Sequence, residues 1–237
     1  MQLEDQLCGL CRRIPPPFER AVAFGVYRHT LRWLIHSLKY DGMEPVADEL
    51  GSRLAQTLLS FEPGAPRNMR VVPVPLHAAK QKLRGFNHAE LLARSAVKAV
   101  CGLQRVEDKS SWDLKMTPGI LERQRATQSQ AGLSPHQRRE NLRGAFFVPR
   151  PDRVKGSHIL LIDDIYTTGA TARACTKALL AAGAEAVWVA TLARAQRETI
   201  QAPRFGAETG PEQERPMRED VAFWDSSFGR PAEPPGH

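Results

Sequence analysis

Residues 159–171 decide how the rest of this 237-residue chain is interpreted: Ile159-Leu160-Leu161-Ile162-Asp163-Asp164-Ile165-Tyr166-Thr167-Thr168-Gly169-Ala170-Thr171. Four apolar residues in a row predict a parallel β-strand that is buried on both faces. Two carboxylates follow at its carboxyl end, then a loop rich in threonine, then an apolar helical pattern over 172–182. Because ligands of open α/β sheets bind at the carboxyl ends of strands, we expect a ligand site here.

The loop has the chemistry of a phosphate site. A helix N-terminus offers unpaired N–H groups and the positive end of the helix dipole. Threonine hydroxyls add donors, and Gly169 lets the backbone approach a ligand closely. We therefore predict that the loop holds a phosphate, with hydroxyl groups or a Mg²⁺ shell against Asp163 and Asp164. The predicted phosphate-binding residues are Ile165, Tyr166, Thr167, Thr168, Gly169, Ala170 and Thr171.

Two other interpretations of the stretch are less favoured. An ordinary strand with a polar turn would leave two adjacent buried carboxylates without a function, which is costly. A Walker B strand would need a G-x-x-x-x-G-K-[ST] stretch, and the sequence has none.

Two like charges at a strand end repel each other, so neutralising both acids is expected to cost little stability and even to raise it.

Composition points to anionic partners. The chain carries a net charge of +7, and residues 80–153 hold 15 Lys/Arg against 7 Asp/Glu. Such a basic region suits phosphates, nucleotides or nucleic acid. With no secretory signal and no long apolar run, we expect a cytoplasmic protein without membrane contact.

The chain divides into three predicted parts. Residues 1–62 form an N-terminal cap, with a strand over 21–27 and helices over 29–40 and 45–60. Residues 63–196 form an α/β core. Residues 197–237, with 5 Lys/Arg against 8 Asp/Glu and many prolines and glycines, have the composition of a disordered acidic tail. Cys8 and Cys11 are half of a metal site; because structural zinc needs four ligands, we do not expect zinc.

Within the core, a strand over 71–75 contains two prolines, which confine it to a sheet edge or put them at the ends of the pairing. A basic loop follows, and Asn87 should cap the next helix in a capping box with Glu90. The loop is a second anion site, suited to pyrophosphate; the alternative is a solvated surface loop. Its residues are His77, Lys82, Arg84 and Gly85.

Further strands are predicted over 114–117, 141–148 and 187–192. The polar segment 118–137 is longer than an ordinary connection and has the length and charge of a basic lid over a phosphate site. Arg125 lies within it, and Gly183 is placed at the end of the helix that follows the loop.

The sequence also resembles a known family. Residues 159–171 look like the phosphoribosyl-pyrophosphate (PRPP) signature of type I phosphoribosyltransferases. Residues 34–40, 72–77, 84–93, 123–133 and 141–146 look like the ComF/GntX family within that class. The resemblance implies a type I phosphoribosyltransferase-like α/β fold, with a mostly parallel sheet, flanking helices and a small N-terminal helical cap. His88 stands where the family usually has Gln. The family commonly opens with a four-Cys zinc module, of which Cys8 and Cys11 match only the last pair.

The resemblance leaves three functions open. The first is a phosphoribosyltransferase, in which Asp163, Asp164 and Arg125 would act on PRPP with Mg²⁺. The second is an accessory protein of natural competence that binds single-stranded DNA or DNA-uptake proteins. The third is a non-catalytic PRPP sensor. An enzyme must bind PRPP and an acceptor, a sensor needs PRPP alone, and a DNA accessory should bind oligonucleotides with a steep salt dependence.

Overall fold

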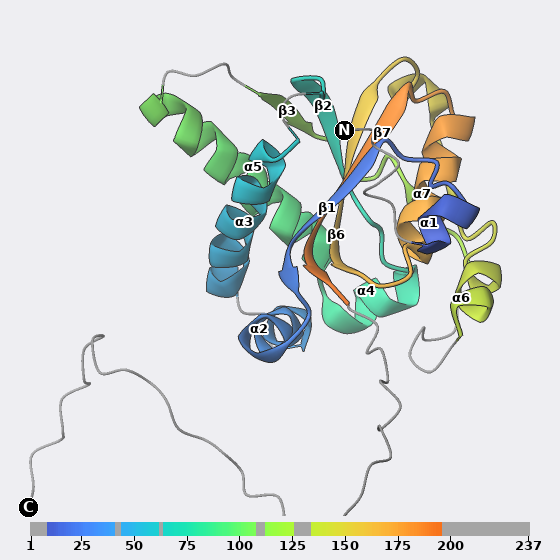
Figure 1. The fold of residues 1–237 in the computed structure, drawn as a ribbon, viewed down its shortest axis with the longest axis horizontal. Helices are drawn as coiled ribbons and strands as arrows, with labels where there is room; N and C mark the ends of the chain where they lie inside the picture. The colour runs from blue at the N-terminus through green and yellow to red at the C-terminus, as the bar shows by residue number, and fades with distance from the viewer. Residues whose placement is uncertain (1–8, 41–43, 62–63, 108–111, 126–133, 196–237) are drawn as a thin grey trace, which may run out of the picture. The chain divides into compact units, whose positions relative to one another are not determined.

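The computed structural model describes residues 9–40, 44–61, 64–107, 112–125 and 134–195. Its centre is a sheet of five parallel strands in the order β1-β7-β6-β2-β3 (Figure 1). A small antiparallel pair, β4 with β5, lies apart from it. The strands are β1 (Arg20–Val26), β2 (Asn68–Pro73), β3 (Asp113–Met116), β4 (Glu122–Arg123), β5 (Phe146–Phe147), β6 (His158–Tyr166) and β7 (Ala186–Arg194).

Helices cover both faces of the main sheet. Figure 1 shows α3 and α5 on one side of the sheet and α7 on the other. Among the described residues, no helix is both long and apolar enough to span a membrane. The helices are α1 (Gly9–Arg13), α2 (His29–Tyr40), α3 (Glu44–Leu59), α4 (Ala78–Arg84), α5 (His88–Glu107), α6 (Pro135–Asn141), the 3-10 turn η2 (Pro151–Arg153) and α7 (Ala170–Ala181).

The central strand β6 is buried on both faces, as its apolar run predicted. Leu160 and Ile162 pack in the core cluster that contains residues of α3 and α5, whereas Ile159 and Leu161 pack in the cluster that contains residues of α7. Successive side chains of a strand point to opposite faces. The two acids that end the strand are therefore expected to face different helices.

The N-terminal segment supplies an edge strand of the main sheet. β1 pairs in parallel with β7 from Arg20 opposite Trp188 to Val26 opposite Arg194. The strand predicted over 21–27 is thus present, and it belongs to the same sheet as the strands after residue 63. The division of the chain at residue 62 stays a prediction, although the sheet itself crosses it.

The proline-containing strand β2 is an inner strand, not an edge. It pairs with β6 on one side and β3 on the other. Pro73 is its last residue, where the missing N–H breaks no ladder inside the strand. The next residue, Val74, still donates its N–H to the Ile162 carbonyl at 2.9 Å. The edge alternative was wrong, and placing the prolines at the end of the pairing was right.

The region of the predicted lid contains a helix that the sequence prediction missed. Residues 126–133 lie outside the described part of the chain, and α6 follows them. Ser134 and Gln137 exchange hydrogen bonds, with Ser134 N–H donating to Gln137 Oε1 at 2.8 Å and Gln137 N–H donating to Ser134 Oγ at 3.3 Å. This is a capping box, and Pro135 fits its first turn.

Of the strand predicted over 141–148, only the two residues of β5, Phe146 and Phe147, form a strand.

Candidate functional site

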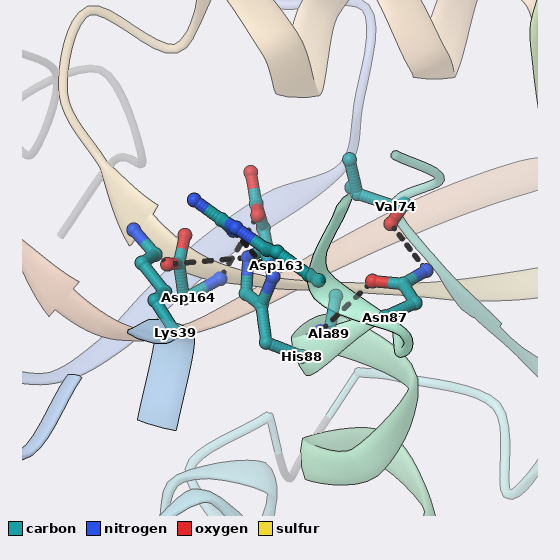
Figure 2. Close-up of polar contacts among 8 residues, drawn as sticks. Lys39, Val74, Asn87, His88, Ala89, Asp163 and Asp164 are labelled. Carbon is teal, nitrogen blue, oxygen red and sulfur yellow. Dashed lines mark hydrogen bonds and ion pairs between the residues drawn. The ribbon is translucent and has the colours of Figure 1, made fainter. Parts of the chain in front are cut away.

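The two acids at the end of β6 have different surroundings. Asp164 Oδ2 forms an ion pair with Lys39 Nζ and lies 3.4 Å from His88 Nε2. Asp163 instead accepts the Asp164 N–H on Oδ1 at 2.9 Å. Figure 2 shows Lys39, from α2, and His88, from the start of α5, converging on Asp164. Asp164 therefore has two side-chain partners, whereas Asp163 bonds to the backbone N–H of Asp164 beside it.

These contacts also fix the tautomer of His88. Arg84 Nη1 lies 3.3 Å from His88 Nδ1, and a guanidinium can only donate, so Nδ1 is the acceptor. The ring proton is then on Nε2, which donates toward Asp164 Oδ2. His88 in this way links a residue of α4 to the end of β6.

The pKa values of the two acids are shifted in opposite directions. Burial raises the pKa of Asp163 well above its ordinary value, and the charge of Asp164 raises it further. Burial also acts to raise the pKa of Asp164, but the nearby Lys39 and His88 outweigh it and hold that pKa well below its usual range. Asp164 is thus the ionised member, and Asp163 is the member that a ligand or metal would help to ionise.

The donors at the acid pair suit a divalent cation. One ligand atom from each of Asp163, Asp164 and His88 lies within 4.8 Å of the other two. Two carboxylates match the oxygen preference of Mg²⁺, which usually keeps several waters and binds one or two protein carboxylates together with substrate phosphates. The residues therefore fit the group that the sequence resemblance implied.

The loop after β6 has the backbone of an anion cradle. Gly169 has φ of 72° and sits at the N-cap of α7. This backbone conformation favours glycine, and a Cβ here would meet the Tyr166 hydroxyl at 2.3 Å, so the tyrosine ring would have to move. Asp163 lines the same small cavity as the loop residues Thr167 and Gly169.

Thr168 carries a buried polar atom that suits a ligand. Its Oγ1 is buried and has no hydrogen-bond partner among the described residues. A buried hydroxyl without a partner is costly, and such groups in native proteins need an explanation. A phosphate oxygen on the loop would supply the missing partner.

The predicted pyrophosphate loop forms the short helix α4. His77 caps it by accepting the Ala79 N–H on Nδ1 at 3.2 Å, and Gly85, with φ of 79°, ends it. Lys82 is exposed on its surface. Arg84 lies with its guanidinium carbon 4.8 Å from the centroid of the Tyr40 ring, which holds it against α2.

Three basic side chains from different parts of the chain lie within electrostatic range of Lys80. Burial lowers the pKa of Lys80, and the positive charges of Arg123, Arg84 and Lys39 lower it further. Burial lowers the pKa of Arg123, and Cys175 and Asp163, where ionised, act to raise it. We call Lys39, Lys80, Arg84 and Arg123 the cation group. Such a concentration of like charge beside the acid pair favours a multiply charged anion.

Other predicted site residues have different neighbours. Arg125 donates from Nη2 to the carbonyl oxygens of Asn141 at 2.9 Å and Arg143 at 3.1 Å, so it ties β4 to the segment before β5. Cys8 lies outside the described residues. Cys11 is described, and its Sγ accepts a hydrogen bond from Arg173 Nη2 at 3.7 Å.

Arg173 holds the N-terminal segment against α7. Its guanidinium is buried and donates to the carbonyl oxygens of Pro15 at 2.8 Å and Ile14 at 2.7 Å. The helix that begins after the loop 167–169 is therefore tied to Ile14 and Pro15 near the start of the described chain.

The structure adds residues that the prediction of the site did not include. The sequence places Lys39 in a predicted helix and in the family-like stretch 34–40, and His88 at a departure from the family pattern, but assigns neither to the site. The signal for Lys39 is its spacing: it follows Ile35 by one turn, on the face that also buries Leu38. A lysine on a buried face needs an acidic partner, but the sequence does not say which one.

The chain is similar in sequence to a protein family and to several known proteins. A family model described as "Phosphoribosyl transferase domain" matches residues 83–227. "DNA utilization protein YhgH" from Salmonella typhi is 34% identical over 79% of this chain and 77% of that protein. "Competence protein F" from Haemophilus influenzae is 30% identical over 82% of this chain and 81% of that protein. Among solved structures, hypoxanthine-guanine phosphoribosyltransferase from Schistosoma mansoni in complex with IMP is 15% identical, with a TM-score of 0.35 over 64% of this chain and 57% of that one.

A parallel sheet with helices on both faces and a threonine-glycine loop after an acidic strand end define a type I phosphoribosyltransferase-like α/β protein. The family match covers more than half of the sequence, and two relatives are at least 30% identical over most of their length. The chain therefore belongs to the phosphoribosyl transferase domain family, and within it to the ComF-type proteins.

Proposed function

We propose that this protein binds PRPP or a related phosphoribosyl ligand together with Mg²⁺. The observation that carries the proposal is the loop 167–171, in which Thr167, Gly169 and Thr171 line a small cavity with Asp163 at the N-terminus of α7. The adjacent Thr168 adds a buried hydroxyl that has no partner among the described residues. These groups suit the 5′-phosphate, and the cation group suits the diphosphate at the other end of the ligand.

The remaining chemistry would need little from the protein beyond positioning and charge. Mg²⁺, held near Asp163 and Asp164, would neutralise the diphosphate as it leaves. Asp163 would accept hydrogen bonds from ribose hydroxyls. Lys80, Arg84 and Arg123 would bind the diphosphate and stabilise its developing charge. The acceptor supplies the nucleophile of such a transfer, so a sensor and an enzyme would share this site and differ only in whether an acceptor binds.

The decisive test replaces the unpartnered hydroxyl. Thr168→Val keeps the shape of the side chain and removes one donor. Because a hydrogen bond to a charged group contributes about 1.5–3 kcal/mol, we expect affinity for PRPP to fall about 10- to 100-fold. Isothermal titration calorimetry with PRPP and Mg²⁺ measures this.

The chain offers a matched control for that variant. Thr176, in α7, has a fully buried side chain, and its Oγ1 likewise lacks a partner within the described chain. Thr176→Val should therefore change the stability in the same direction as Thr168→Val but leave PRPP affinity unchanged. If both variants bind PRPP as the wild type does, the phosphate does not lie on this loop.

A second candidate function follows from the relatives, whose names refer to DNA utilization and competence. A single-stranded-DNA accessory would use the basic segment 80–153, in which Arg143 is strongly exposed. Replacing Arg138, Arg139 and Arg143 by Glu should then weaken oligonucleotide binding and leave PRPP binding intact. Fluorescence anisotropy across a salt series measures it, and affinity should fall steeply with salt. Absence of binding at low salt would remove this candidate.

A further inference from the structure

Lys39 occupies an unusual position for a surface-helix lysine. It comes from α2, in the N-terminal part of the chain, and reaches the acid pair at the carboxyl end of the central strand. Its side chain is 19% exposed and that of Asp164 is 8% exposed, so the ion pair is shielded from solvent. An amine held this way contributes a fixed positive charge at the point where a divalent cation would have to bind.

The same ammonium group also interacts with Lys80, another member of the cation group. Lys39 and Lys80 repel each other, and the charges of Arg84 and Arg123 also act on Lys80. Lys39 is therefore attracted by the Asp164 carboxylate and repelled by the Lys80 ammonium group. An anion that bound among the cations would reverse that repulsion and attract Lys39 away from Asp164.

We propose that Lys39 is a tethered cation that neutralises Asp164 in the ligand-free protein and keeps divalent ions off the acid pair until an anionic ligand draws it away. The identity of that ligand rests on the proposed function, whereas the competition between Lys39 and a divalent ion does not.

Lys39 and a divalent metal ion would compete because both are cations that bind the same carboxylate. Lys39 and a metal ion would both seek the Oδ2 atom of Asp164, which His88 already contacts. Two cations on one buried oxygen repel each other strongly, because little water is present to screen them. The ligand-free site is therefore closed to metal, although its donors suit one. Metal and phosphoribosyl ligand would bind together and not in sequence, because the anion that releases Asp164 is also the one that coordinates the metal.

The test removes the tethered charge and measures metal binding without any ligand. Mn²⁺ serves as the probe because carboxylate ligands suit it as they suit Mg²⁺, and its spin resonance reports free and bound ion. The wild type should bind Mn²⁺ weakly at this site. Lys39→Met should bind it at least 10-fold more tightly, and Mn²⁺ should raise the unfolding temperature of this variant more than that of the wild type.

Three variants locate the effect. Lys39→Arg keeps the charge and should behave as the wild type. Lys177→Met removes an exposed lysine of α7 and should change nothing. Asp163→Asn combined with Lys39→Met should lose the gained affinity, because a metal ligand has been removed. If Lys39→Met does not fold, Lys39→Gln retains a neutral donor to Asp164 and carries the same expectation.

The inference is overturned if Lys39→Met, or Lys39→Gln where the Met variant does not fold, binds Mn²⁺ no more tightly than the wild type. It is also overturned if the gained Mn²⁺ affinity survives the added Asp163→Asn change. A separate arm adds PRPP to the wild type. If PRPP fails to bind while Lys39→Met gains Mn²⁺, the competition stands and the phosphoribosyl assignment falls. If PRPP binds and promotes Mn²⁺ uptake by the wild type, both stand.

Discussion

Asp164→Asn is expected to lower the free energy of unfolding by about 3–5 kcal/mol, the usual cost of removing one partner of a buried ion pair. The change would leave the ammonium group of Lys39 shielded from solvent without a counter-charge. Asp163→Asn should have the opposite sign. Burial and the charge of Asp164 already raise the pKa of Asp163, so removing its charge should leave stability unchanged or raise it at neutral pH.

The two variants should also separate with pH. The folded-state pKa of Asp164 is depressed, so its contribution to stability is present above the unfolded value of about 3.9 and is lost as pH falls toward the folded pKa. The folded-state pKa of Asp163 is raised, so its ionisation costs stability as pH rises from about 3.9 through that pKa. Urea unfolding at pH 3 to 8 should show the Asp164 difference growing only up to about pH 5 and then staying level, because both states are ionised above that pH. The Asp163 difference should have the opposite sign and keep growing above about pH 4, toward the raised folded-state pKa.

This result would correct the expectation drawn from the sequence alone, in which neutralising both acids costs little stability. That expectation treated the acids as a like-charged pair. The structure instead gives Asp164 two partners, Lys39 and His88, so removing the Asp164 charge should lower stability. Removing the Asp163 charge should only relieve its repulsion by Asp164. Equal effects of the two single variants would contradict the split that we describe.

Gly169→Val is expected to reduce PRPP affinity by at least about 100-fold. The new side chain would collide with the Tyr166 hydroxyl, and its backbone would resist the φ of 72°. Moving the loop would misplace two or more donors, and each hydrogen bond to a charged group contributes about 1.5–3 kcal/mol. Calorimetry with PRPP and Mg²⁺ gives the affinity, and circular dichroism shows whether the variant is folded.

The other end of the same helix provides the control. Gly183 has φ of 95°, and the nearest atoms to an added Cβ belong to Lys155 at 3.5 Å or more. Gly183→Val should therefore impose a similar backbone strain without touching the loop. Both variants should lose stability, and only Gly169→Val should lose the ligand. Wild-type affinity in a folded Gly169→Val variant would remove the loop from the binding site.

Local patterns were enough to predict most of the fold. The helix predicted over 29–40 has the observed bounds of α2, and the apolar run of β6 is buried on both faces. Asn87 caps α5 by accepting the Ala89 N–H at 3.1 Å, as its position indicated. Glu90 does not complete the capping box, because its carboxylate binds Arg94 one turn later. Such signals act over a few residues, and sequence patterns report that range well.

The candidate site was predicted only in part, because half of it depends on contacts between distant segments. The loop 165–171 and the acids are contiguous, so one motif revealed them. Lys39 and His88 reach Asp164 from other helices, and nothing local marks their shared target. Arg125, which the sequence predicts to contact a ligand, donates to backbone carbonyls of Asn141 and Arg143, and its role toward a ligand stays a prediction. The sequence did not single out Arg123, whose pKa is affected by Asp163.

The hydrogen bonds from Arg173 to Ile14 and Pro15 limit how this protein can be shortened or tagged. Trimming the first 17 residues as a dispensable leader would strip two carbonyl acceptors from a buried guanidinium, on the helix that begins at the phosphate loop. The damage would then reach ligand affinity from a cut that looks remote in the sequence. An affinity tag with its cleavage site is better kept well ahead of Ile14, and purified fragments that begin after Pro17 make poor material for binding assays.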